Sequence, residues 1–121
     1  MSELPDFGLG YPRTELRRQL VQAVLAGEKI ATAGLADEEE PPRAGDRFAL
    51  YDEEDRVVGV VEVTEARVVP AGEIDLQFAQ DEGEGFESVA DWHEAHERFF
   101  ERTIDDETLI DAVRFRIVER L

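Results

Sequence analysis

A single lysine stands out among the basic residues of this chain. Of the 13 lysines and arginines, only Lys29 is a lysine. Arginine stays protonated at any accessible pH, whereas a lysine whose pKa is depressed can act as a base or a nucleophile. Chance survival or a surface position would also explain Lys29. The chemical interpretation makes Lys29, within Gly27-Glu28-Lys29-Ile30-Ala31-Thr32, the first candidate for a functional site.

Composition limits the kind of protein that can carry such a site. The chain has 121 residues, 42% of them hydrophobic, which predicts one domain over residues 1–121 with a core from about residue 7 to 119. The absence of cysteine excludes disulfides, zinc–thiolate centres and cysteine nucleophiles. No stretch approaches the roughly 20 apolar residues of a membrane span, and the start lacks the basic and apolar pattern of a signal peptide. We expect a cytoplasmic protein.

The net charge restricts the partners. At -17, the chain is strongly acidic for its length, and non-specific nucleic-acid binding depends on many Lys/Arg–phosphate contacts. We therefore expect no DNA partner, whereas binding of a small ligand in a local basic pocket is still compatible with this charge. The lack of an apolar span predicts no membrane partner. A host with high internal salt and a high-GC host with an acidic proteome both fit this charge.

The elements that must position the site follow from local patterns. Turn residues, caps and apolar periodicity predict helices at Thr14–Ala26, Glu73–Gln80 and Ser88–Arg102. They predict strands, the first of them short or looped, at Ile30–Leu35, Arg47–Tyr51, Arg56–Val69 and Thr108–Glu119. This order indicates the α+β class, a small mixed β-barrel flanked by helices. Gly59 indicates a bulge or a close approach within its strand.

Several motifs occur in an order that resembles a known family. They are Gly27-Glu28-Lys29-Ile30-Ala31-Thr32-Ala33, Pro42-Arg43-Ala44-Gly45-Asp46, Phe78 to Gly85 with its Glu-Gly-Glu-Gly, and Trp-x-x-x-His-x-x-Phe-Phe from Trp92. The first resembles the Gly-x-Lys-x-x-Thr signature of the ASCH domain, a PUA-like β-barrel, and the whole looks most like the bacterial YhfF-like branch. The resemblance covers roughly residues 7 to 119.

The resemblance implies a barrel with a cleft and a substrate among modified nucleosides or short RNA. Some ASCH proteins are amidohydrolases that deacetylate N4-acetylcytidine through a lysine, a threonine and an acidic-loop glutamate, without a cofactor. By position these become Lys29, Thr32 and Glu82. Other members are linked to RNA cleavage or to RNA binding in translation control. The chain departs from the amidohydrolase pattern at Gly34, where an arginine is frequent, and at Ile30, which is often polar.

Amide hydrolysis needs a nucleophile, a proton acceptor and an oxyanion stabiliser. In a tight turn, Lys29 and Thr32 would share a face, and a neutral lysine could take the threonine proton. Glu82 could then orient the amine or protonate the leaving nitrogen. The alternatives are a phosphate-contacting Lys29, a Thr32 that is an ordinary strand residue, and a Glu82 that only solubilises its loop.

Four further residues are candidates for substrate binding. Glu84 lies between two glycines, which favours a constrained loop near a ligand. Arg43 could contact a phosphate or ribose, although pairing with nearby acids explains it too. Trp92 or Tyr11 could stack on a base, and the alternative for Trp92 is a core position above a hydrogen-bonded His96. We expect no metal site, because His93 and His96 lack an assured third ligand.

Two functions therefore compete. The first is a metal-free hydrolase of an acylated nucleoside or similar small amide that uses Lys29, Thr32 and Glu82. The second is a module that binds RNA or a nucleotide, with Lys29 on a phosphate. Lys29→Arg distinguishes them, because phosphate binding tolerates either cation and a neutral amine has no arginine equivalent.

Overall fold

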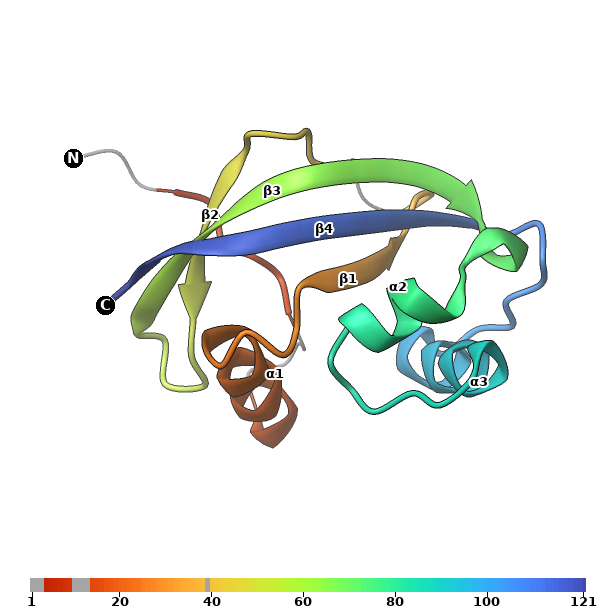
Figure 1. The fold of residues 1–121 in the computed structure, drawn as a ribbon, viewed down its shortest axis with the longest axis horizontal. Coiled ribbons are helices and arrows are strands. Elements are labelled where there is room, and N and C mark those ends of the chain that lie inside the picture. The colour runs from red at the N-terminus through yellow and green to blue at the C-terminus, as the bar shows by residue number, and fades with distance from the viewer. Residues whose placement is uncertain (1–3, 10–13, 39) are drawn as a thin grey trace.

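The computed structural model describes residues 4–9, 14–38 and 40–121. Its centre is a curled antiparallel sheet of four strands in the order β1-β4-β3-β2. The strands are β1 (Ala31–Leu35), β2 (Arg47–Tyr51), β3 (Val57–Pro70) and β4 (Leu109–Arg120). The long β3 and β4 arch across the molecule, and all three α-helices lie on the same side of the sheet (Figure 1). The sheet forms a half-barrel with an α+β arrangement, as the sequence predicts.

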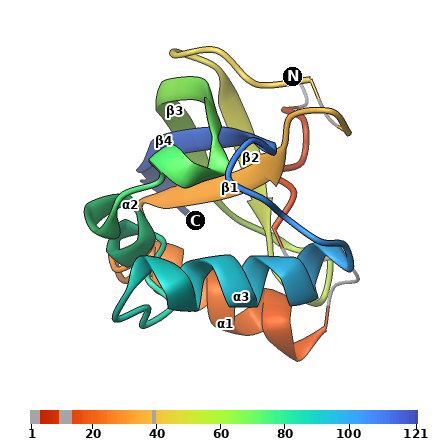
Figure 2. The ribbon, with the colours of Figure 1, turned by 90° about the vertical axis from the view of Figure 1, so that its right-hand side faces the viewer.

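Side chains cap two of the three α-helices that the structure describes, whereas Thr14, which precedes the first, makes no side-chain capping hydrogen bond. Helices α1 (Glu15–Leu25) and α3 (Val89–Phe100) both lie beneath the sheet (Figure 2), under different parts of it (Figure 1). Ser88 accepts a hydrogen bond from the amide of Asp91 at 3.0 Å and so caps α3. Asp75 caps the short α2 (Leu76–Asp81) through the amide of Phe78 at 2.8 Å. A 3-10 turn, η1 (Ala71–Glu73), precedes Asp75, so the helix expected at Glu73–Gln80 begins later than predicted.

Two apolar clusters hold the helices to the sheet. One joins β1 and β4 to α2 and α3, and Trp92 is at its centre with no exposed surface. The other joins α1 to β2, β3 and β4, around Leu50 and Val61. The chain segment before β1 and the α2–α3 loop meet at the edge of the first cluster, and the candidate functional site lies there.

Two details differ from the expected pattern or refine it. Leu16, expected on the apolar stripe of α1, is 38% exposed, whereas Arg17 is completely buried and donates to the carbonyl oxygen of Tyr51 at 3.1 Å. Gly59 is a close approach, because a Cβ there would lie 3.0 Å from the carbonyl oxygen of Glu119. Within the described part of the chain, no helix is long and apolar enough to cross a membrane.

Candidate functional site

Lys29 is buried immediately before β1, with 2% of its side chain exposed. Its Nζ donates to the backbone carbonyl oxygens of Ala31 at 2.9 Å and Glu82 at 3.1 Å. The carboxylates of Glu84 and Glu82 lie 3.6 and 3.9 Å from the same Nζ. All of these neighbours are acceptors. Two of the three N–H groups of an ammonium donate to carbonyls, and the third is left to these carboxylates or to a ligand oxygen.

Glu82 ends α2 as its C-cap and is 1% exposed. The indole Nε1–H of Trp92 donates to Glu82 Oε2. His96 Nε2 lies 3.4 Å from the other oxygen, Oε1. The backbone next to Glu82 is also anchored, because the amide of Ile30 donates to the carbonyl oxygen of Asp81 at 2.8 Å. The carboxyl group is therefore held by α3 on one side and by the Lys29 segment on the other.

A small pocket opens beside these groups. We call it the lysine pocket. It is about 230 Å³ in volume. Its polar lining is Lys29, Thr32, Glu82, Glu84 and His96. The apolar lining includes Leu16, which explains why this residue of α1 is not packed into the core. Three residues expected to be catalytic, Lys29, Thr32 and Glu82, and the expected binding residue Glu84 thus line one pocket.

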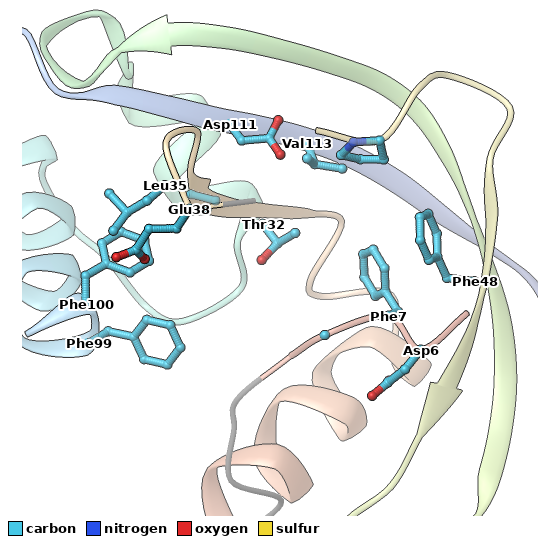
Figure 3. Close-up of a pocket in the computed structure, with 14 residues that line it drawn as sticks. Asp6, Phe7, Thr32, Leu35, Glu38, Phe48, Phe99, Phe100, Asp111 and Val113 are labelled. Carbon is cyan, nitrogen blue, oxygen red and sulfur yellow. The ribbon is translucent and has the colours of Figure 1, made fainter. Parts of the chain in front are cut away.

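A second, larger pocket of about 400 Å³ adjoins the first. We call it the aromatic pocket, after Phe7, Phe48, Phe99 and Phe100 in its lining. The two pockets share lining residues, among them Thr32 and Phe99. In Figure 3, Thr32 stands on β1, with Phe99 and Phe100 of α3 on one side and Phe7 and Phe48 on the other. Thr32 thus lies at the junction of the two pockets.

The charged groups of the aromatic pocket are carboxylates wherever the structure describes its lining. They are Asp6, Glu38 and Asp111. Asp6 lies 3.7 Å from the guanidinium of Arg17, and Glu38 lies 3.8 Å from that of Arg102. Gly34, which replaces the frequent arginine of the family pattern, also lines this pocket. The pocket therefore has no arginine from that position.

Two expected substrate-binding residues do not reach the pockets. Trp92 has no exposed surface, so it cannot stack on a base, and its indole instead fixes Glu82. The core position was the alternative for this residue. Arg43 is exposed on the turn before β2 and lines neither pocket. Tyr11 lies outside the described residues.

His96 also belongs to this site, although the sequence predicts only a core position for it. It stacks on Trp92 with ring centroids 4.3 Å apart, and its Nδ1 lies 2.8 Å from the Trp92 carbonyl oxygen. Burial acts to lower the pKa of His96. The hydrogen bond and charge of Glu82 outweigh it, with smaller help from the Trp92 carbonyl and Glu84, so that the pKa is raised above its ordinary value. Only the placement of the α2–α3 loop against α3 shows this partnership.

The two histidines have different partners. His93 faces Glu97 at 3.8 Å, whereas His96 faces Glu82. Among the residues that the structure describes, no group of three or more His, Asp or Glu side chains is arranged to hold a metal ion.

Solved structures with the same fold resemble this one over most of their length. Protein EF3133 from Enterococcus faecalis V583 is 24% identical, with a TM-score of 0.81 over 100% of this chain and 84% of that chain. The ASCH domain from Lactobacillus crispatus JV V101 is 22% identical, with a TM-score of 0.82 over 98% and 81%. The hypothetical protein PH0355 is 20% identical, with a TM-score of 0.62 over 85% and 94%. No curated protein matches the sequence.

The family model of the ASCH domain matches residues 9–119, which is nearly the whole chain. The match includes every described residue that lines the lysine pocket except Gly8. This chain therefore belongs to the ASCH domain family, whose fold is PUA-like.

Proposed function

We propose that this ASCH domain hydrolyses a small amide of the acylated-nucleoside type, such as N4-acetylcytidine. The observation that carries the proposal is the convergence of Lys29, Thr32 and Glu82 on one pocket of about 230 Å³. Two of these groups are buried and fixed by hydrogen bonds, which is the preorganisation that acyl transfer needs. The third supplies a hydroxyl.

Thr32 is the nucleophile in this proposal. Its Oγ forms a bond to the amide carbon while the carbon–nitrogen bond breaks, and the departing nitrogen gains the proton that it needs to leave as an amine. Water then attacks the acyl group on Thr32, releasing the carboxylic acid and restoring the hydroxyl. Glu82, at the end of α2, is the carboxyl group through which the protons pass.

Lys29 acts as a donor in this proposal. Among the described residues, no hydrogen bond joins Lys29 to Thr32, and the printed neighbours of Nζ are all acceptors. Such surroundings suit an N–H group that stabilises the oxyanion better than a base that must accept the threonine proton. This assignment differs from the role of proton acceptor that the sequence predicts for a neutral Lys29.

In this proposal, each of the two pockets holds one part of the substrate. The lysine pocket is smaller than the roughly 300–1,000 Å³ of sites for drug-sized ligands, whereas the aromatic pocket falls within that range. The acyl group would occupy the first, and the base or sugar the second, where phenylalanine rings offer stacking surfaces. Thr32, at the junction, would meet the amide carbon.

The alternative is an RNA- or nucleotide-binding module without turnover. Two features weigh against it. Lys29 lies beside the carboxylates of Glu82 and Glu84, whose negative charge opposes a phosphate group more than a neutral amide. The charged groups described in the aromatic pocket are carboxylates, which repel a phosphodiester. An uncharged nucleoside meets neither obstacle.

The test is the release of cytidine from N4-acetylcytidine by the purified protein at low and at molar salt. Lys29→Ala should abolish turnover, and Arg43→Ala, outside both pockets, should retain it. Absence of turnover by the wild type at both salt concentrations would refute this substrate and favour the binding module.

A further inference from the structure

The position of the protons in the Glu82–His96 contact follows from the acceptor on the far side of the imidazole. His96 Nδ1 lies 2.8 Å from the backbone carbonyl oxygen of Trp92. A carbonyl oxygen only accepts, so Nδ1 must carry a hydrogen. In a neutral ring this leaves Nε2 with a lone pair. That lone pair would face Oε1 of Glu82 at 3.4 Å.

A neutral imidazole and an ionised carboxylate are therefore mismatched in this geometry. Two acceptors would face each other in a buried site, where an unmade hydrogen bond is costly. A proton between Nε2 and Oε1 removes the conflict. The same proton gives Oε1 of Glu82 a hydrogen-bond donor. Both oxygens of the carboxylate then accept a hydrogen bond, since Oε2 already accepts from the indole of Trp92.

The charged neighbours fix which partner holds the proton. Glu82 and Glu84, both in the segment after α2, are the acidic groups that raise the pKa of His96. The ammonium of Lys29 lies on the other side of Glu82, with Nζ 3.9 Å from Oε1. The Phe86 and Phe100 rings cover the imidazole and carry no charge. Two carboxylates thus face His96, and the lysine faces the carboxylates.

We propose that His96 and Glu82 form a buried imidazolium–carboxylate pair that stores one proton beside the lysine pocket and exchanges it during catalysis. The exchange rests on the proposed amide hydrolysis, whereas the pair itself does not. Both residues line the pocket, which gives the stored proton access to a bound molecule.

The pair keeps its proton count in each step of the hydrolysis. As Thr32 Oγ bonds to the amide carbon, the stored proton goes to the leaving nitrogen and the threonine proton replaces it in the pair. When water attacks the acyl group, the pair takes one proton from the water and returns one to Oγ. One proton resides on the pair before and after each step, and no other acid or base is required.

The pair can be tested without a substrate by following the ring nitrogens with nitrogen-15 NMR. The chain has two histidines, so His93→Gln assigns both sets of signals. At about pH 6.5, the ordinary histidine pKa, His96 should carry protons on both nitrogens in most of the molecules. Glu82→Gln should return the ring to the neutral form with hydrogen on Nδ1. Glu97→Gln is the matched control, since Glu97 faces His93 and should leave His96 unchanged.

A neutral His96 at that pH in the wild type would overturn the pair whatever the activity. The wild-type spectrum alone decides this, so a variant that fails to fold does not weaken the test. An imidazolium that persists in Glu82→Gln would also overturn the pair, because Glu82 would then not be the group that keeps the ring protonated.

The catalytic use of the proton has its own readout. His96→Gln keeps an N–H group but cannot donate a proton, so kcat for N4-acetylcytidine should fall by about tenfold or more with little change in KM. In the wild type, kcat should fall as the pH rises through the folded-state pKa of His96, and this fall should be absent in His96→Gln. Unchanged kcat in His96→Gln would overturn the exchange. An imidazolium in a protein without turnover would support the pair and overturn the exchange together with the proposed hydrolysis.

Discussion

The ammonium group of Lys29 donates to the backbone carbonyl oxygen of Glu82 at 3.1 Å, across 53 positions of sequence. This bond ties the entry of β1 to the end of α2. The amide of Ile30 strengthens the connection by donating to Asp81, one residue before Glu82. The lone lysine of the chain therefore both builds the pocket and contributes a group to it. Its substitution should affect stability as well as activity.

Replacing Lys29 with methionine should lower the free energy of unfolding by about 3–5 kcal/mol, the usual effect of removing one partner from a buried ionic contact. Methionine fills much of the same space but leaves the carbonyls of Ala31 and Glu82 without this donor. Urea unfolding of the two proteins measures the difference.

The control for this substitution is Arg98→Met, which removes another cation from an ion pair, with Glu94 on the exposed face of α3. Exposed pairs contribute little to stability. A Lys29→Met variant as stable as Arg98→Met would mean that the buried contacts of Lys29 do not support the fold.

Gly83 should tolerate alanine less well than Gly85. Both have a positive φ, +71° and +81°, so alanine costs about 1–2 kcal/mol in backbone strain at either position. At Gly83 the new Cβ would also lie 2.5 Å from the carbonyl oxygen of Glu28, whereas at Gly85 it meets nothing within 4 Å. Urea unfolding should show an additional loss of about 1–3 kcal/mol for Gly83→Ala.

Equal losses for the two alanine variants would mean that the Asp81–Gly83 turn does not pack tightly on the Lys29 segment. The larger loss should come with reduced turnover, because the same turn carries Glu82.

The wild type should lose stability as the pH rises above about 6.5, the ordinary histidine pKa, in a way that His96→Gln does not. The folded-state pKa of His96 is raised, so its contribution is complete below the unfolded value of about 6.5 and disappears as pH rises through the folded value. Urea unfolding at a series of pH values gives the slope.

His93→Gln is the control for this slope, because it removes the other histidine, which is partly exposed and faces Glu97. It should keep the wild-type pH dependence. Parallel curves for wild type and His96→Gln would contradict the assignment of a raised pKa to His96.

Local sequence signals predict most of the fold. The strand Arg47–Tyr51 agrees residue for residue, and Ser88 caps α3 as expected. These features depend on turns, alternation and caps within a few residues, which a sequence displays directly. The later start of α2 depends on Asp75, whose side chain can cap the helix only because the preceding chain leaves η1 in an extended conformation.

The site could be predicted only in part. The family pattern identifies Lys29, Thr32 and Glu82, the flanking glycines single out Glu84, and these four residues do line one pocket. The pattern cannot show that Trp92 and His96 hold the two oxygens of Glu82, because those contacts depend on how the α2–α3 loop folds back on α3. The burial of Arg17 beside Asp6 is a long-range contact of the same kind.

The most direct test of this account is the rate of cytidine release from N4-acetylcytidine by the wild type and by Thr32→Val, measured side by side. Valine keeps the shape of threonine on β1 and replaces the hydroxyl at the junction of the two pockets with a methyl group. The wild type should turn over, and the kcat of Thr32→Val should be about a hundredfold or more lower while the fold is retained. Equal turnover by the two proteins, or none by the wild type, would contradict this account.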